Sequence, residues 1–218
     1  MSESTDAPLR LPRIGDPAPQ FTSPSTHGST SLSDFAGKWV VLFSHPADFT
    51  PVCTTEFLEF ARRSKDFAAL NTQLIGLSID SVYSHIAWAR FMEQNFDVTV
   101  DFPILADLSQ SVAAAYGMLH PGESSTATVR AVFVIDPEQV IKAMIYYPLT
   151  TGRTINEVYR LVQALQLNVN HGLATPEGWQ PGDACIVPPP ATMKAAAERM
   201  ASDYEVTDWF LSKTKSPV

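Results

Sequence analysis

The sequence predicts an α/β sandwich, in which a central mixed sheet is flanked by helices, followed by a C-terminal extension. Short apolar runs rich in β-branched residues alternate along the chain with segments whose apolar residues recur every three or four positions. After Asn170 this alternation gives way to a stretch rich in Pro and Gly. At 218 residues the chain exceeds a typical single domain of about 100–150 residues. We therefore expect a main domain over residues 1–170 and an extension over residues 171–218.

The N-terminal part of the main domain predicts β structure. Residues 1–33 are rich in Pro, Ser, Thr and Gly, which indicates irregular strands and turns, with Phe21 and Leu32 as core anchors. Residues 39–43, Trp-Val-Val-Leu-Phe, form a continuous apolar run typical of a strand that is buried on both faces. We expect this run to be a central strand that ends near His45.

The middle of the chain alternates helices with strands. From Pro51 the apolar residues fall on one face of an amphipathic helix. Residues 73–79 then predict a strand, residues 84–95 a helix and residues 109–116 another short helix. The inner face of the first helix is expected to consist of Phe57, Phe60, Ala61, Ser64, Phe67 and Ala68, and that of the second of Ile86, Phe91 and Phe96.

A hairpin and a closing helix complete the predicted main domain. Residues 130–135 and 140–146 are apolar runs on either side of a Pro-containing turn, and residues 155–167 predict a helix with Val158, Leu161, Val162 and Leu165 inward. The extension predicts no regular elements until a short Ala-rich helix. Its apolar side chains would be costly to leave in water, so we expect them to pack on the main domain or on another subunit: Trp179, Ile186, Val187, Trp209, Phe210 and Leu211.

Composition and charge exclude several classes of protein. The formal charge is −8 and the 15 Lys and Arg residues are scattered, so we expect neither nucleic acid nor a membrane surface as a partner. No apolar run approaches the ~20 residues of a membrane span, and the first ten residues lack a signal peptide's apolar core. We expect a cytoplasmic protein. Cys53 and Cys185 form no CxxC and have no histidine at a ligand-like spacing, so no metal site, cofactor or disulfide framework is predicted.

Cys53 occupies a position that favours reactivity. Thr50 is a good N-cap and Pro51 suits the first helical position, which places Cys53 third in the helix. There the sulfur lies near unpaired backbone N–H groups and the positive end of the helix dipole, both of which favour thiolate over thiol. Thr50 and Cys53 have the spacing of a CxxC pair whose first sulfur is replaced by a hydroxyl. That replacement excludes dithiol exchange at this turn and suits a small oxygen-containing electrophile.

The segment around Cys53 resembles the active-site signature of peroxiredoxins. The run SHPADFTPVCTTE is most similar to the one-cysteine, peroxiredoxin 6-like subfamily, and the resemblance covers roughly residues 10–190. It implies a thioredoxin-like fold. The other matching runs are LIGLSIDSVYSHIAW, FPILAD, YGMLHPG, VRAVFVID, YPLTTGR and ATPEGWQPGD.

The resemblance implies a role for each matching residue. Cys53 corresponds to the peroxidatic cysteine, and Thr50 to the hydroxyl that hydrogen-bonds the peroxide. Pro46 corresponds to the shield of the pocket, Arg130 to the cation that activates the thiolate, and Arg153 to the second active-site arginine. Attack of a thiolate on a peroxide oxygen expels an alkoxide, so fixed donors and a guanidinium lower the barrier where negative charge develops.

Three further residues have less specific signals. Glu56 is expected to orient an arginine from the turn after Cys53. His45 is either a pocket residue or a histidine satisfied at the end of a strand, and the sequence favours neither. Cys185 lies where the subfamily commonly carries an aliphatic residue, so a packing role is favoured over a resolving role.

The resemblance implies a thiol-dependent peroxidase that reduces hydrogen peroxide and organic hydroperoxides and serves antioxidant defence. A sulfenic acid at Cys53 would be recycled by an external thiol such as glutathione or thioredoxin. A peroxide sensor or holdase that uses the same cysteine is an alternative. A phospholipase is disfavoured, because residues 36–40, AGKWV, lack the serine of the corresponding lipase segment. The resemblance also implies at least a homodimer with the extension crossing to its partner, and a ring of dimers is a larger alternative.

Overall fold

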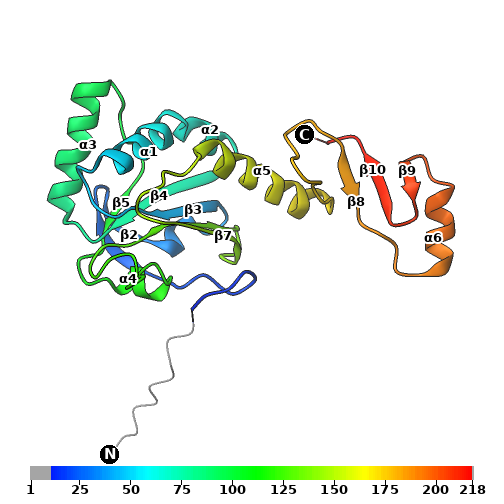
Figure 1. Cartoon of the computed structure of the whole chain (residues 1–218), viewed down its shortest axis with the longest axis horizontal. Helices are drawn as coiled ribbons and strands as arrows, with labels where there is room; N and C mark the ends of the chain where they lie inside the picture. Colours follow the sequence, from blue (N-terminus) through cyan, green and yellow to red (C-terminus); the bar gives the residue numbers. More distant parts are fainter. Residues whose placement is uncertain (1–10, 218) are drawn as a thin grey trace, which may run out of the picture. The chain divides into compact units, whose positions relative to one another are not determined.

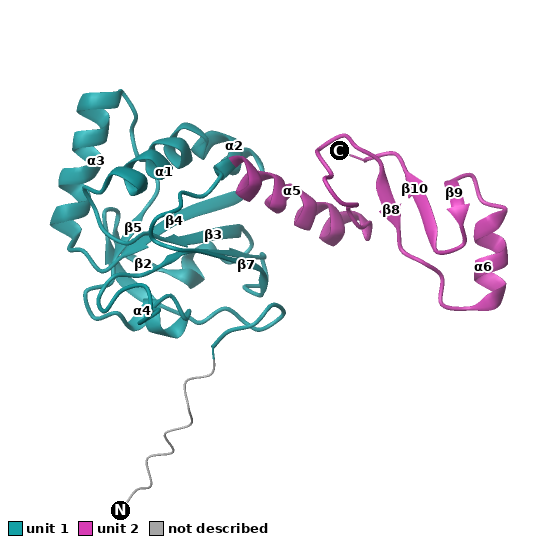
Figure 2. Ribbon diagram, viewed as in Figure 1, with its two compact units in different colours: residues 1–155 teal, residues 156–218 magenta. Residues whose placement is uncertain are grey.

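The computed structural model describes residues 11–217, which form two compact units divided between Ile155 and Asn156 (Figure 2). Unit 1 contains the sheet and helices of the α/β sandwich, and unit 2 contains nearly all of helix α5 and the C-terminal extension. The expectation of irregular β structure over residues 1–10 lies outside the described residues. No helix between residues 11 and 217 combines the length and the apolar character that crossing a membrane requires.

Unit 1 is built on a seven-stranded mixed sheet (Figure 1). The strand order is β2-β1-β5-β4-β3-β6-β7, in which β3, β4 and β5 are parallel and β6 is antiparallel to both β3 and β7. This arrangement confirms the predicted fold class. The strands are β1 (Thr22–Ser25), β2 (Gly28–Ser31), β3 (Trp39–Ser44), β4 (Thr72–Ser78), β5 (Ile104–Ala106), β6 (Arg130–Ile135) and β7 (Ile141–Tyr147).

The helical segment after Pro51 consists of two helices, where the sequence predicts one. The expected continuous helix after Pro51 is divided at Arg63, whose backbone φ of −99° and ψ of 5° end one helix before the next begins. The helical elements are the 3-10 helix η1 (Leu32–Phe35) and the α-helices α1 (Pro51–Arg62), α2 (Ser64–Ala69), α3 (Val82–Phe96) and α4 (Ser111–Ala115).

The buried face of α3 is not the predicted one. The residues expected to face inward are substantially exposed: Ile86 by 42%, Phe91 by 41% and Phe96 by 46%. The fully buried positions are His85, Trp88 and Met92, which recur at i, i+3 and i+7. The prediction was wrong because α3 carries apolar residues on more than one face, and the buried face is the one on which His85 finds hydrogen-bond partners.

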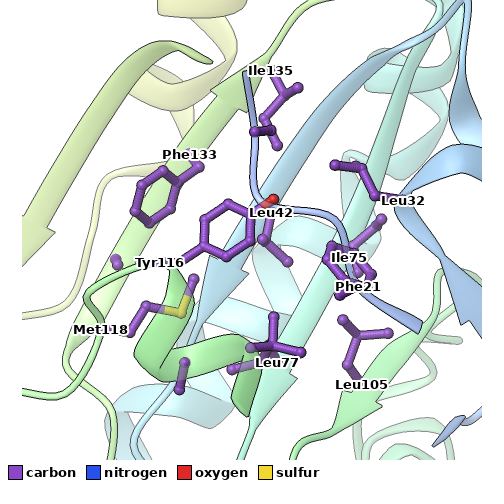
Figure 3. Packing of buried hydrophobic residues seen from close by; sticks show 14 of the residues in the cluster. Phe21, Leu32, Leu42, Ile75, Leu77, Leu105, Tyr116, Met118, Phe133 and Ile135 are labelled. Carbon is purple, nitrogen blue, oxygen red and sulfur yellow. The ribbon is translucent and has the colours of Figure 1, made fainter. Parts of the chain in front are cut away.

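The main core of unit 1 lies on one face of the sheet (Figure 3). Alternate residues of the central strands point into it, and Phe21 and Leu32 join it as predicted. The cluster also takes side chains from α4 and the segment after it. Its labelled members in Figure 3 are Phe21, Leu32, Leu42, Ile75, Leu77, Leu105, Tyr116, Met118, Phe133 and Ile135.

The opposite face of the sheet packs against α1. Because side chains alternate along a strand, Phe43 points away from the core that contains Leu42. Phe43 stacks on Phe60 of α1 with ring centroids 3.9 Å apart. A side chain at Gly76 of the neighbouring strand would lie 2.9 Å from the Phe57 ring, so only glycine permits this close approach. The same alternation places Arg130, at the start of β6, on the α1 face.

Unit 2 contains more regular structure than the sequence predicts. The extension forms a three-stranded antiparallel sheet in the order β8-β10-β9, although its Pro- and Gly-rich composition indicated no strands. The Pro- and Gly-rich stretch precedes β8, helix α6 separates β8 from β9, and Trp209 and Phe210 form the turn between β9 and β10. The elements are α5 (Ile155–His171), β8 (Cys185–Val187), α6 (Met193–Met200), β9 (Glu205–Asp208) and β10 (Leu211–Thr214).

Burial of the extension's apolar residues is divided. Trp179 and Cys185 are buried in a small cluster with Ala164 and Leu167, which belong to the same unit. The side chains of the β9–β10 turn, in contrast, remain exposed within the single chain, with Trp209 at 42% and Phe210 at 52%. The expected covering of Trp209, Phe210 and Leu211 is therefore not supplied inside unit 2.

Candidate active site

Cys53 lies where the sequence places it, in the first turn of α1. The chain leaves β3 at Ser44, crosses a short loop and enters the helix with Thr50 as N-cap and Pro51 at its first position. Phe49, just before the cap, has a φ of 55°, a left-handed conformation that is strained for an aromatic residue. Cys53 is the third helical residue and its side chain is fully buried.

The side chain of Thr50 does not cap the helix. Its hydroxyl donates to the carbonyl of Ala47 in the preceding loop at 2.9 Å, and no cap hydrogen bond to α1 is formed. The first N–H groups of a helix have no intrahelical acceptor, so the N–H groups beside Cys53 are left for an oxygen or anion. The Thr50 oxygen keeps its lone pairs, which can accept a proton from a hydroperoxide.

Arg130 reaches from β6 to the sulfur of Cys53. Its Nη1 lies 3.3 Å from Sγ and also donates to Glu56 Oε2 at 2.8 Å. Its Nε and Nη2 both donate to the carbonyl of Leu149, at 3.1 and 2.8 Å. The guanidinium is 2% exposed, so its charge acts on the sulfur with little screening by water.

Glu56 binds both Arg130 and Arg153, whereas the sequence predicted that it orients one arginine. Its Oε1 accepts from the backbone N–H and Nε of Arg153 at 2.7 and 2.9 Å, and its Oε2 accepts from Arg153 Nη2 and Arg130 Nη1, each at 2.8 Å. Burial raises the pKa of this carboxyl, but the hydrogen bonds and charge of Arg153 and the charge of Arg130 outweigh it and leave the pKa below its usual range. Glu56 is therefore ionised at neutral pH.

Arg153 is anchored as firmly as its carboxylate partner. Its Nη1 donates to the carbonyl of Ala131 at 2.8 Å, and its guanidinium carbon lies 5.7 Å from the centre of the Phe43 ring. Two guanidinium groups and one carboxylate thus form a buried cluster with one uncompensated positive charge. Negative charge that develops at Cys53 would face Arg130 Nη1 at 3.3 Å.

His45 belongs to a second buried cluster. Its Nε2 lies 2.8 Å from Asp48 Oδ1, and Nδ1 of His85 lies 2.8 Å from Asp48 Oδ2. The three side chains are buried, and they are the group in the described part of the chain whose atoms are spaced closely enough to suit a metal ion. One ring nitrogen of each histidine lies at hydrogen-bond distance from Asp48, which a proton explains without a metal. Pro46, next to His45, is also buried.

The structure therefore sorts the predicted site residues into three groups. Cys53, Glu56, Arg130 and Arg153 are joined by direct contacts. Thr50 and Pro46 lie in the loop between β3 and α1, and His45 lies with the second cluster. The resemblance singles out Cys53, Thr50, Pro46, Arg130 and Arg153, whereas Glu56 and His45 have less specific signals.

Sequence reasoning missed Asp48, His85 and the Leu149 carbonyl. His85 was detectable, because it precedes Trp88 and Met92 at the helical spacing that marks the inner face of α3. A backbone carbonyl that accepts from an arginine leaves no mark on the sequence, because every residue carries one.

Comparison with known proteins gives a consistent result. The chain matches the AhpC/TSA family over residues 14–144 and the C-terminal domain of 1-Cys peroxiredoxin over residues 164–202. A peroxiredoxin of Aquifex aeolicus is 52% identical in an alignment of 218 residues that covers 95% of this chain and 98% of that protein.

Two solved structures are also similar. A mutant of peroxiredoxin 6 from Arenicola marina has a TM-score of 0.85 at 37% identity and covers 94% of this chain and 98% of its own. A yeast mitochondrial 1-Cys peroxiredoxin has a TM-score of 0.85 at 40% identity and covers 94% of this chain and 100% of its own. The fold and the matches define a thiol-dependent peroxidase with a thioredoxin-like fold. Within that class the chain belongs to the peroxiredoxin family, in its one-cysteine, peroxiredoxin 6-like branch.

Proposed function

We propose that Cys53 is the peroxidatic residue and that its thiolate reduces hydrogen peroxide and organic hydroperoxides in antioxidant defence. The observation that carries this proposal is the 3.3 Å contact between Sγ and Arg130 Nη1 inside a buried cluster that lacks one negative charge. The thiolate supplies that charge. The names of the relatives favour catalytic turnover over the sensor, holdase and phospholipase alternatives.

The oxidation of Cys53 by a hydroperoxide needs no cofactor. The Cys53 thiolate attacks the outer oxygen of R–O–O–H, an S–O bond forms and the O–O bond breaks, which yields Cys53–SOH and RO⁻. Arg130 and the first-turn N–H groups face the charge that moves onto the departing oxygen. Thr50, whose hydrogen is engaged by Ala47, accepts the hydroperoxide O–H and orients it for attack.

We infer that an external thiol completes the cycle. One thiol R′SH attacks Cys53–SOH and releases water, and a second R′SH attacks the mixed disulfide, which returns Cys53–SH and gives R′S–SR′. The similar yeast protein is described as resolved through the glutathione and thioredoxin systems. Cys185 is packed in the Trp179 cluster, which supports a structural role.

Peroxide consumption by purified protein tests the cycle. With glutathione or thioredoxin as reductant, we expect Cys53→Ser to lose turnover while it retains the fold, because a serine hydroxyl is hardly ionised at neutral pH. Cys185→Ser is the matched control and should turn over at the wild-type rate. Substantial turnover by Cys53→Ser would reject the assignment.

We also propose that the chain forms homodimers in which residues 171–218 pack on the partner. The match to the C-terminal domain of 1-Cys peroxiredoxin and the exposed Trp209 and Phe210 support this assembly. Light scattering at micromolar concentration separates monomer, dimer and ring of dimers by mass. A monomeric mass at all concentrations would contradict the proposal.

A further inference from the structure

The pairing of β3 with β6 ends one residue before β3 itself. The last pair of their antiparallel register joins Phe43 to Val132, and Ser44 is the final residue of β3. Beyond that pair the side chain of Ser44 contacts the other strand. Its Oγ donates to the carbonyl of Val129 at 2.6 Å and accepts from the N–H of Ala131 at 3.1 Å. A side chain thus joins the two strands where their pairing ends.

The two contacts of Ser44 enclose Arg130. Val129 and Ala131 are the neighbours of Arg130 in the chain, and the Ala131 N–H also lies 3.1 Å from the Val129 carbonyl. A hydrogen bond over this spacing defines a three-residue turn, whose central residue has a narrow range of backbone dihedrals. The Ser44 hydroxyl connects both ends of this turn to β3. It therefore fixes the backbone from which the Arg130 side chain extends.

A second buried hydroxyl joins the same two segments in the opposite direction. Thr128 Oγ1 donates to the carbonyl of His45 at 2.8 Å. Ser44 and Thr128 are both fully buried, where a lost hydrogen bond is not replaced by one to bulk water. The start of β6 is thereby held against the end of β3, and from there the chain continues to Thr50 and Cys53.

Ser44 lies on the other side of the sheet from the reacting sulfur. Because side chains alternate along a strand, Ser44 points to the side of the main core, whereas Phe43 points toward α1. Arg130 is the residue that links the two sides, since its backbone contacts Ser44 through its neighbours and its Nη1 lies 3.3 Å from Sγ of Cys53.

We propose that the Ser44 hydroxyl positions Arg130 for the reaction of Cys53, because it bonds to the backbone on both sides of this arginine and so fixes the direction of its side chain. The proposal rests on the proposed function of Cys53 and Arg130. Glu56 and the Leu149 carbonyl hold the guanidinium end of the side chain, and Ser44 holds its backbone end. If the backbone end moves, we expect the contact with the sulfur to lengthen first, because sulfur is the weakest of these acceptors.

Ser44→Ala removes the hydroxyl, and Ser25→Ala is the matched control. Ser25 is a buried serine of the same sheet whose Oγ also makes two hydrogen bonds, at 2.8 and 2.9 Å. In Ser44→Ala the Ala131 N–H and the Val129 carbonyl still have each other as partners, so we expect the variant to fold. Circular dichroism spectra check that both variants do.

The rate of Cys53 oxidation by peroxide tests the effect on the reaction. Ser44→Ala should slow it about tenfold, the scale of a displacement of about half an ångström, while Ser25→Ala should react at the wild-type rate. In the Arg130→Met background, Ser44→Ala should change the rate by less than about twofold, because the side chain that it positions is gone. A wild-type rate for Ser44→Ala would overturn the proposal, and so would an equal loss in both backgrounds.

Nitrogen-15 NMR of the Arg130 Nε–H group tests the placement without peroxide. This group donates to the Leu149 carbonyl at 3.1 Å, and its signal is identified by its absence from Arg130→Met. We expect the signal to shift and to exchange faster with water in Ser44→Ala but not in Ser25→Ala. An unchanged signal in Ser44→Ala would overturn the proposal. If that variant does not fold, Ser44→Cys supplies a weaker donor of similar size for the same measurement.

The two measurements separate this proposal from the proposed function. If wild-type Cys53 does not react with peroxide, or if Arg130→Met reacts at the wild-type rate, the proposed function of these residues is rejected. A displaced Arg130 signal in Ser44→Ala would still establish that Ser44 positions this side chain.

Discussion

Replacement of Glu56 by Gln should strongly destabilise unit 1. The carboxylate receives four hydrogen bonds from two buried guanidinium groups and one backbone N–H, two on each oxygen. A glutamine keeps one acceptor oxygen and turns its NH₂ group toward the other pair of donors. Two charge-assisted bonds are lost, and Arg130 and Arg153 lose the carboxylate that they share.

The expected loss is about 3–5 kcal/mol, the cost of removing one partner from a buried ion pair. With a urea m-value of about 2 kcal/mol/M, the urea concentration at the midpoint of unfolding should fall by roughly 1.5–2.5 M. Urea titrations followed by circular dichroism measure this shift. Peroxide oxidation of Cys53 in the folded variant should also slow, because Arg130 loses the carboxylate that holds its Nη1 beside the sulfur.

Glu59→Gln is the control on the same helix. Glu59 forms an exposed pair with Arg62 at 3.8 Å, and an exposed pair of this kind is worth about 0–1 kcal/mol. Both variants replace a glutamate by a glutamine, but Glu56 is buried and makes more hydrogen bonds than Glu59. If Glu56→Gln costs no more than Glu59→Gln at an unchanged m-value, Glu56 does not anchor the two arginines.

Four further predictions concern the same site. Because the pKa of Glu56 is depressed in the folded state, its stabilisation is complete above the unfolded value of about 4.3 and is lost as the pH falls further, so acid titration of Glu56→Gln should show a smaller loss over that range than wild type. Thr50→Val should slow peroxide reduction about 10²-fold in stopped-flow measurements, the scale of a small misplacement of reacting groups, and a smaller effect than tenfold would remove its positioning role. Arg130→Met should slow the oxidation of Cys53 by peroxide, and an unchanged rate would reject the role of the cation. One equivalent of peroxide should give sulfenic acid at Cys53 and a second equivalent sulfinic acid, without a bond to Cys185, as intact mass and non-reducing gels would show; a stoichiometric disulfide that vanishes in Cys185→Ser would establish a two-cysteine cycle.

The sequence by itself determined the local features of this protein. The apolar run before His45 specified a central strand, and Thr50 and Pro51 specified the start of α1, so the placement of Cys53 in the first turn followed from nearby residues alone. The spacing of apolar residues and the capping of helix ends depend on residues only a few positions apart, so both can be recognised without a structure.

The sequence was less informative where distant residues compete for burial. The inner face of α3 was wrongly assigned because His85 is accepted into the interior only with Asp48 and Leu105 as partners. The strands of the extension were missed because three short segments become a sheet only when they pair with one another. Neither condition is visible in the composition of a single segment.

Only the tertiary structure decided which charges meet at the sulfur. Arg130 follows Cys53 by 77 positions and Arg153 follows Glu56 by 97. β-sheet pairing places Arg130 on the α1 face, and the loop between β7 and α5 brings Arg153 to Glu56. Successive side chains of β6 point to opposite faces of the sheet, which directs Arg130 toward Glu56. The carbonyl of Leu149 then fixes the guanidinium of Arg130, and that of Ala131 fixes the guanidinium of Arg153. A one-dimensional pattern supplies the residue types, but the balance of two cations against one carboxylate exists only once the folded chain buries them within hydrogen-bond distance of one another.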